Sequence, residues 1–199
     1  MPAHASTGSL VSVSLQQSSL APQIKVGAVV LATSLTAAAA QFTMPLPLTA
    51  VPFVLTPMVV LLAGAALGSR LGALSQVLYL AAGVAGLPVF APSVTLPPGA
   101  LRLIGPTGGY LLAYPVAAFV TGWLAERGWD RRYLSSAAAM LLGLAIIFAG
   151  GVSWLALGFA QSPTAALASG LLPFIALDTV KVIAAAAILP TAWKLLGKT

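Results

Sequence analysis

Long apolar runs with almost no charges constrain the fold of this chain more than any other feature. Residues 134–158, for example, contain no Asp, Glu, Lys or Arg. A helix that crosses a membrane needs about 20 mostly apolar residues. Only 6% of the 199 residues are charged, whereas about a quarter is usual in a soluble domain. Because so few charges cannot cover a surface that faces water, the sequence predicts an integral membrane protein.

Six segments have the length and apolarity of membrane helices, and they predict an all-α fold with six transmembrane helices. They are residues 25–42, 52–68, 71–87, 108–125, 134–158 and 173–195. We expect the second helix to be short and kinked by Pro52 and Pro57. A further stretch, 164–172, could form a short reentrant or surface helix.

The remaining segments are tails and loops. Residues 1–23 are rich in Ser and Gln and are expected to be a polar tail, which leaves 24–199 as a single membrane domain. Residues 87–106 contain five prolines and form a long loop between the third and fourth helices. Proline lowers the conformational entropy of an open loop, so this loop should be stiff and lose little entropy on closing over a ligand.

The Lys and Arg residues predict the orientation, because loops on the cytoplasmic side are enriched in them. With both termini inside, all but two of the nine cations fall on the cytoplasmic side. The exceptions are Arg102, in the loop that is then extracellular, and Lys181, inside the sixth helix. The same scattered distribution argues against a nucleic-acid-binding stripe.

Several classes of chemistry lack the residues they need. The chain has no cysteine, and its one histidine, His4, lies in the polar tail, so no metal site is expected. It has three acidic residues and no membrane histidine, a poor inventory for an intramembrane enzyme. No phosphate-binding loop of the G-x-x-x-x-G-K-[ST] type occurs. We therefore expect neither catalysis nor a cofactor.

Asp178 and Lys181 stand three positions apart inside the sixth apolar segment. Residues at this spacing share one face of a helix and can form an ion pair. The pair could simply neutralise itself, or Lys181 could extend towards the membrane surface. Charged groups within a membrane are costly and usually functional, however, so we favour a pair that faces a ligand. Such a ligand would carry N–H donors and an anionic group.

The loop before the fourth helix offers a second candidate site. The guanidinium of Arg102 could bind a carboxylate with two hydrogen bonds, or could simply face lipid headgroups. Gly105, Gly108 and Gly109 permit close backbone approach. Tyr110 and Tyr114 share a helix face, and on the sequence alone we interpret them as part of an aromatic belt at the membrane surface rather than a pocket wall.

Small residues recur every four positions in the first helix, at Ala28, Ala32, Thr36 and Ala40. Stripes of this kind allow membrane helices to pack closely. The simpler interpretation is packing within the chain, and the alternative is docking of a separate membrane subunit.

Three stretches resemble the BioY family, the biotin-specific substrate-binding (S) components of energy-coupling factor (ECF) vitamin importers. They are "VPFVLTPMVVLLAGAALGSRLGALSQVLYLAAGVAGLPVF" at 51–90, "GPTGGYLLAYPVAAFVTGWLAERG" at 105–128 and "LPFIALDTVKVIAAAAI" at 172–188. The resemblance runs from about residue 24 to the end of the chain. It implies six helices with both termini cytoplasmic, high-affinity biotin binding near the outer face of the cell membrane, and no catalytic activity. The implied partners are a transmembrane coupling subunit and two cytoplasmic ATPase subunits.

The resemblance also implies roles for individual residues. Asp178 would accept hydrogen bonds from the ureido nitrogens of biotin, Lys181 would donate to the ureido oxygen or hold Asp178 ionised, and Arg102 would bind the carboxylate. The reverse arrangement, with Lys181 on the carboxylate, stays open. Further ligand-binding residues would be Gly105, Gly108, Gly109, Tyr110, Phe90, Phe174 and Thr56, with Trp154 as another wall. The partner-docking residues would be Ala28, Ala32 and Thr36.

Two features depart from the family pattern. Thr56 stands where relatives tend to carry a glutamine, and the chain has no asparagine, so an amide contact to the ligand would have to come from Gln41, Gln76 or Gln161. Two other functions stay open: an S component for a different small vitamin, and a membrane assembly subunit that transports nothing. The sequence also leaves open whether transport occurs alone, as an oligomer or only within a complex.

Overall fold

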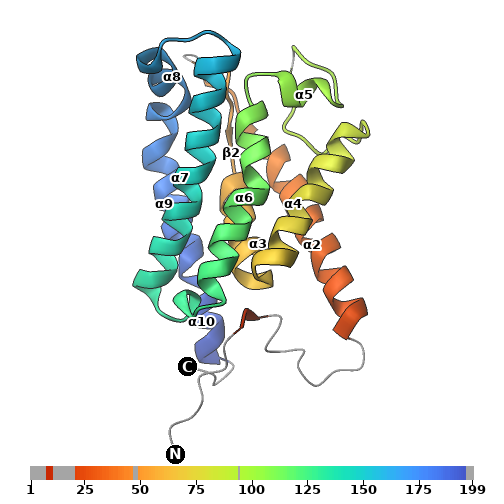
Figure 1. Cartoon of the computed structure of the whole chain (residues 1–199), viewed down its shortest axis with the longest axis vertical. Helices are drawn as coiled ribbons and strands as arrows, with labels where there is room; N and C mark the ends of the chain where they lie inside the picture. The colour runs from red at the N-terminus through yellow and green to blue at the C-terminus, as the bar shows by residue number, and fades with distance from the viewer. Residues whose placement is uncertain (1–7, 11–20, 47–48, 94, 196–199) are drawn as a thin grey trace, which may run out of the picture.

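The protein is a bundle of helices in a computed structural model that describes residues 8–10, 21–46, 49–93 and 95–195. In Figure 1 the long helices run roughly along one axis, with α6 between α3, α4 and α7. The elements are α2 (Ala21–Gln41), β1 (Thr43–Met44), β2 (Phe53–Val54), α3 (Thr56–Leu67), α4 (Ser69–Val84), α5 (Leu101–Ile104), α6 (Gly108–Ala125), η1 (Trp129–Arg131), α7 (Tyr133–Gly158), α8 (Pro163–Gly170), α9 (Leu172–Ala186) and α10 (Ile188–Leu195).

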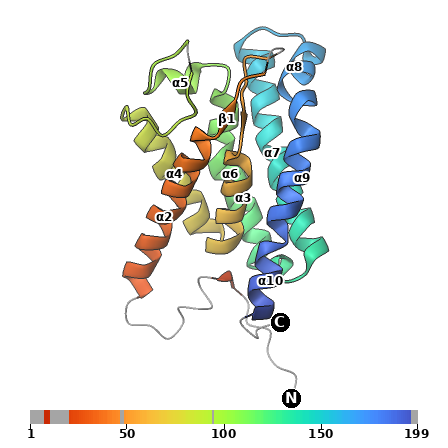
Figure 2. The same cartoon turned by 180° about the vertical axis from the view of Figure 1, so that it is seen from behind.

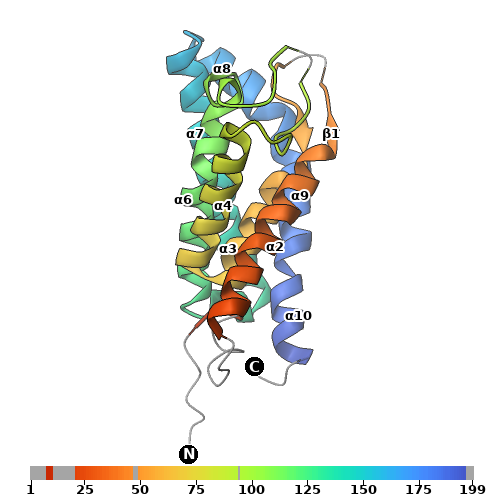
Figure 3. The ribbon, with the colours of Figure 1, turned by 90° about the vertical axis from the view of Figure 1, so that its right-hand side faces the viewer.

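The two ends of the bundle are built differently. The start of α2 and the end of α10 lie at one end, which we call the terminal end (Figures 1 and 2). The other end, which we call the loop end, carries α5, α8 and the hairpin of β1 and β2. Figure 3 shows the same division from the side, with α2 crossing in front of α3 and α4.

Within the described residues, four helical segments are long and apolar enough to cross a membrane. They are Pro22–Gln41, Gly108–Ala125, Tyr133–Gly158 and Leu172–Leu195. Helix α6 has the expected bounds, and α7 begins one residue earlier than expected. Helix α8 lies where a short helix was thought possible. The prediction of a mostly helical, multi-pass membrane protein is therefore confirmed.

The second expected span differs from the structure. Its helix, α3, has 12 residues and begins at Thr56, so the expected start at residue 52 is wrong. Residues Phe53 and Val54 instead form β2, which pairs antiparallel with β1. Proline has no N–H and a φ that suits a helix, so it is tolerated in the first turn of a helix, and Pro57 is the second residue of α3. The sequence reasoning missed the hairpin.

Gly64 and Gly68 show two different reasons why glycine is needed in and after α3. Gly64 of α3 lies against the backbone of Ala118 in α6, where an added Cβ would collide with the Ala118 carbonyl group. Small residues at such crossings increase the contact between membrane helices. Gly68 joins α3 to α4 with a φ of 88°, a conformation that other residues rarely adopt.

The sixth expected span is divided into α9 and α10 near Pro190. Proline cannot donate the backbone hydrogen bond that the Ala186 carbonyl would receive in a continuous helix. Ser136 Oγ of α7 donates to that carbonyl instead, at 2.8 Å. The bond satisfies a buried backbone oxygen and attaches the break to α7, as membrane proteins require at such sites.

Candidate functional site

A cavity of about 520 Å³ lies towards the loop end of the bundle. This volume is within the range of roughly 300–1,000 Å³ that small-molecule sites usually have. The hairpin region, residues 90–93 and 95–96, α5 and the first turns of α6 and α9 all contribute to its lining. Most of the lining is apolar, with a few polar side chains that could orient a ligand.

Asp178 of α9 lines the cavity although its exposed fraction is only 5%. Its Oδ1 lies 2.5 Å from Lys181 Nζ in the ion pair expected from their spacing. Apart from Lys181, no described residue donates a hydrogen bond to this oxygen. A carboxylate can accept about four hydrogen bonds, so Asp178 retains capacity for a ligand donor.

Lys181 is not among the residues that line the cavity. Its Nζ donates to the Val54 carbonyl at 2.6 Å and lies 3.9 Å from the centre of the Phe53 ring. Lys181 therefore connects two parts of the site, because it neutralises Asp178 and holds β2 against α9.

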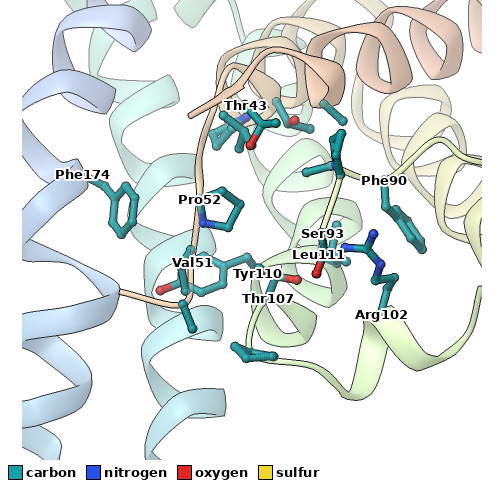
Figure 4. A pocket seen from close by; sticks show the side chains of 18 of the residues that line it. Thr43, Val51, Pro52, Phe90, Ser93, Arg102, Thr107, Tyr110, Leu111 and Phe174 are labelled. Carbon is teal, nitrogen blue, oxygen red and sulfur yellow. The ribbon is translucent and has the colours of Figure 1, made fainter. Parts of the chain in front are cut away.

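Arg102 of α5 also lines the cavity and is buried. Its Nε donates to the Pro97 carbonyl at 3.1 Å, so a backbone oxygen of the proline-rich loop helps to fix the orientation of the guanidinium. Burial lowers the pKa of Arg102 from its usual value, but an arginine side chain remains charged in proteins. Figure 4 shows Arg102 and Phe174 on opposite sides of the cavity. Asp178 follows Phe174 by one turn of α9, so a cation and a carboxylate face the same cavity from different elements.

Aromatic rings form much of the wall between these charges. Tyr79 meets Phe90 edge to face, with ring centres 5.3 Å apart, and stacks with Tyr114 at 6.4 Å. The Tyr110 hydroxyl donates to the Gly170 carbonyl at 2.7 Å, which leaves its ring as cavity wall. Because Tyr110 and Tyr114 are buried inside the bundle, the aromatic-belt interpretation is wrong.

The three glycines before and within α6 do not line the cavity. Gly108 and Gly109 pack against Trp154 of α7, and Trp154 Nε1 donates to the Gly105 carbonyl at 2.9 Å. These residues fix how α6 meets α7, close to the cavity, and Trp154 is likewise absent from the lining. Their predicted contact with a ligand stays a prediction.

Other predicted polar contacts have varied positions. Thr56 lines the cavity from the start of α3. The Gln41 side chain donates to the Pro88 carbonyl at 3.2 Å, whereas Gln76 is fully buried beside Thr36. Gln161 accepts from Ser169.

Sequence reasoning missed several lining residues, and most of them are apolar. Examples from the lining are Val51, Tyr79, Leu111, Ile147 and Phe148. An apolar residue that faces a cavity has the same sequence pattern as one that faces lipid, so no signal distinguished them. The hairpin threonines Thr43 and Thr49 were also missed, because the hairpin itself was not expected.

The small-residue stripe of α2 faces the interior. Ala32 packs with Ala63 and Leu67 of α3, and Thr36 accepts a hydrogen bond from Gln76 of α4 at 3.3 Å. Ala28 is partly buried beside the same cluster. Packing within the chain therefore accounts for the stripe. Docking of a partner on Ala28, Ala32 and Thr36 stays a prediction, and it would require α2 to separate from α3.

Comparison with known proteins supports the resemblance seen in the sequence. The probable biotin transporter BioY of Pyrococcus horikoshii is 40% identical over 79% of this chain and 88% of its own length. The biotin transporter BioY of Thermotoga maritima is 40% identical over 72% of this chain and 81% of its own length. Both relatives are covered over most of their length.

A solved structure has the same fold. The S-component for biotin from an ECF-type ABC transporter aligns with a TM-score of 0.80 at 24% identity, over 89% of this chain and 95% of that one. The family model described as the BioY family matches residues 13–198, which is nearly the whole sequence. The chain therefore belongs to the BioY family.

Proposed function

We propose that this protein binds biotin in the cavity and takes part in biotin uptake as the S component of an ECF-type importer. Relatives named as biotin transporters support the proposal, and so does the fold shared with a biotin S-component. The BioY family consists of transport components, so the chain is not an enzyme. We expect the protein to need no cofactor.

The observation that carries the proposal is a cavity with Asp178 and Arg102 in its lining and aromatic walls between them. Biotin has a ureido ring with two N–H donors, an apolar middle and a carboxylate tail. Asp178 would accept from the ureido nitrogens, because its carboxylate retains unused acceptor capacity. Arg102 would bind the tail carboxylate, and Tyr110, Phe90 and Phe174 would enclose the apolar part.

In this proposal Lys181 does not contact the ligand directly, because it does not line the cavity. Its contacts with Asp178 and Val54 favour the role of keeping Asp178 ionised over direct contact with the ligand. Thr56 would add a hydroxyl near the ring.

We propose six membrane crossings with both termini in the cytoplasm. The four long helical segments would be joined by α3 with its preceding hairpin and by α4. The distribution of Lys and Arg supports this orientation in the cytoplasmic membrane, because the terminal end holds most of them. A transmembrane coupling subunit and two ATPase subunits would be the partners, since this sequence has no nucleotide-binding loop.

Binding measurements on purified protein test the function. Isothermal titration should show tight binding of biotin and much weaker binding of other vitamins. Biotin amide tests the orientation: the wild type should prefer biotin by about tenfold or more, and Arg102→Gln should remove that preference. Equal affinity for biotin and its amide in the wild type would contradict the Arg102 contact. Absence of biotin binding would contradict the function itself.

A further inference from the structure

The terminal end has an unbalanced positive charge. Figure 1 shows the start of α2, the start of α4, the ends of α6 and α10 and the start of α7 there, and Lys25, Arg70, Arg127, Arg132 and Lys194 lie in or next to these parts of the chain. The whole chain has three side-chain carboxylates, Glu126, Asp130 and Asp178. Asp178 belongs to the opposite half of the molecule, so two side-chain carboxylates remain for the terminal end.

Both of these carboxylates already have partners within the chain. Glu126 Oε1 accepts from Ser69 N at 2.7 Å and from Ser69 Oγ at 3.0 Å, which joins the end of α6 to the start of α4. Asp130 Oδ2 accepts from Trp193 Nε1 at 2.6 Å. In the part of the chain that the structure describes, the ion pair found within 4 Å is Lys181–Asp178. Among the described residues, Lys25, Arg70 and Arg127 have no carboxylate within that distance, so these three cations can bind an anion from outside the chain.

Three of these cations share one groove. Lys25 of α2, Arg70 of α4 and Arg127 at the end of α6 line a groove of about 600 Å³, together with Phe119 and Trp123 of α6. Figure 1 shows the helices that form it, with α2 diverging from α4 towards the terminal end. With Glu126 as the one acidic lining residue, the groove keeps a surplus of positive charge.

One of the cations is held in place by an aromatic ring. The Arg127 guanidinium lies 3.5 Å from the centre of the Trp123 ring, and its Nη1 donates to the Trp123 carbonyl at 2.9 Å. Arginine has five N–H donors and binds phosphate oxygens with two of them at once. Stacking on tryptophan reduces the entropy that the side chain loses on binding an anion.

An apolar stripe leads away from the groove along α6. Leu112, Val116, Phe119 and Trp123 share one face of the helix at spacings of three and four residues, and all are exposed. A dissolved anion such as inorganic phosphate would leave this stripe unused. A phospholipid would place its phosphate in the groove and an acyl chain along the stripe.

We propose that this groove is a binding site for an anionic phospholipid. Lys25, Arg70 and Arg127 bind the headgroup phosphate, and Phe119 and Trp123 contact the first part of the acyl chain. The basic groove lies at the membrane surface that the proposed topology makes cytoplasmic, where anionic lipids attract such residues. The site is separate from the biotin cavity and holds the terminal end against one leaflet.

Trp123 allows a direct test in vesicles. The protein would be reconstituted with brominated phosphatidylglycerol or brominated phosphatidylcholine, and the Trp123 signal obtained by subtracting the fluorescence of Trp123→Phe. We expect phosphatidylglycerol to quench Trp123 at a mole fraction about tenfold lower than phosphatidylcholine. Lys25→Gln/Arg70→Gln should remove most of this preference without changing biotin affinity.

A matched control separates the groove from general charge. Arg132→Gln/Lys194→Gln removes the same amount of charge from the terminal end, but outside the groove, and should retain the preference for phosphatidylglycerol. Lys25→Arg/Arg70→Lys keeps the charge of the groove and should retain this preference too. Equal loss in the Arg132→Gln/Lys194→Gln control would overturn the proposal, as would an unchanged preference in Lys25→Gln/Arg70→Gln. If that groove variant kept its lipid preference but lost association with a coupling subunit, the groove would bind an acidic protein segment and the lipid proposal would be wrong.

Discussion

The two ends of this membrane protein each contain a buried aspartate, and the surroundings of the two residues differ. Asp178, near the loop end, is 5% exposed, forms an ion pair with Lys181 and lines a cavity. Asp130, at the terminal end, is 1% exposed and accepts a hydrogen bond from Trp193 Nε1. Trp193 is fully buried, and Arg131 lies over its ring.

The comparison shows that burial of a carboxylate does not by itself indicate a ligand site. Asp130 joins η1 to α10 and lines neither the biotin cavity nor the basic groove at the terminal end. Both aspartates have a cation nearby, Arg131 for Asp130 and Lys181 for Asp178. Asp178 differs because it lines a cavity, so its remaining acceptor capacity can serve a ligand. We therefore expect substitutions at Asp178 to change binding and substitutions at Asp130 to change stability.

Lys181→Met should have the largest effect. It leaves Asp178 buried without its cation, which typically costs about 3 kcal/mol of folding stability. It also frees β2 from α9, so biotin affinity should fall as well. Equilibrium unfolding in detergent and titration with biotin measure the two effects. The double variant Lys181→Met/Asp178→Asn should recover much of the stability but not the affinity, and recovery of both would show that neither charge serves the ligand.

Asp178→Asn tests the loop end directly. The substitution replaces a charged acceptor by a neutral one at nearly the same size, so biotin affinity should fall by about 2 kcal/mol, or roughly 30-fold. Asp130→Asn is the matched control and should leave biotin affinity unchanged. Similar losses in both variants would break the distinction between the two ends.

Trp193→Phe tests the terminal end. It removes the donor to Asp130 and leaves a buried acceptor without its partner, at a cost of about 1–3 kcal/mol of folding stability. Thermal unfolding measures the loss, and biotin affinity should not change. A reduction in biotin affinity of the folded variant would mean that the terminal end also controls the cavity.

The smallest effect should be a pH dependence at Asp130. Burial raises the pKa of this carboxyl above its usual value of 3.8, despite the opposing bond from Trp193. A raised pKa in the folded state means that the stability contributed by the protonated form is lost as the pH rises through that pKa. Asp130→Asn cannot ionise, so its stability should increase relative to the wild type from near pH 3.8 upwards. A difference that is constant with pH would contradict the raised pKa.

The sequence predicted best those features that have a single physical explanation. The charge-free run of α7 and the bounds of α6 followed from apolarity alone, and the spacing of Asp178 and Lys181 predicted their ion pair. The hairpin was missed because two-residue strands leave no periodic pattern. The aromatic-belt interpretation of Tyr110 was wrong because a tyrosine at a helix start has the same sequence context in a belt and in a cavity wall.

The sequence by itself determined that the chain lies in a membrane, which segments are helical, and that one aspartate and one lysine lie together among apolar residues. These properties depend on composition and local spacing. Only the tertiary structure decided that Arg102 and Asp178 line one cavity, that Lys181 binds the backbone of β2, and that the small residues of α2 face inwards. Those contacts join residues up to 127 positions apart, and in a uniformly apolar helix hydrophobicity cannot indicate which face meets protein and which meets lipid.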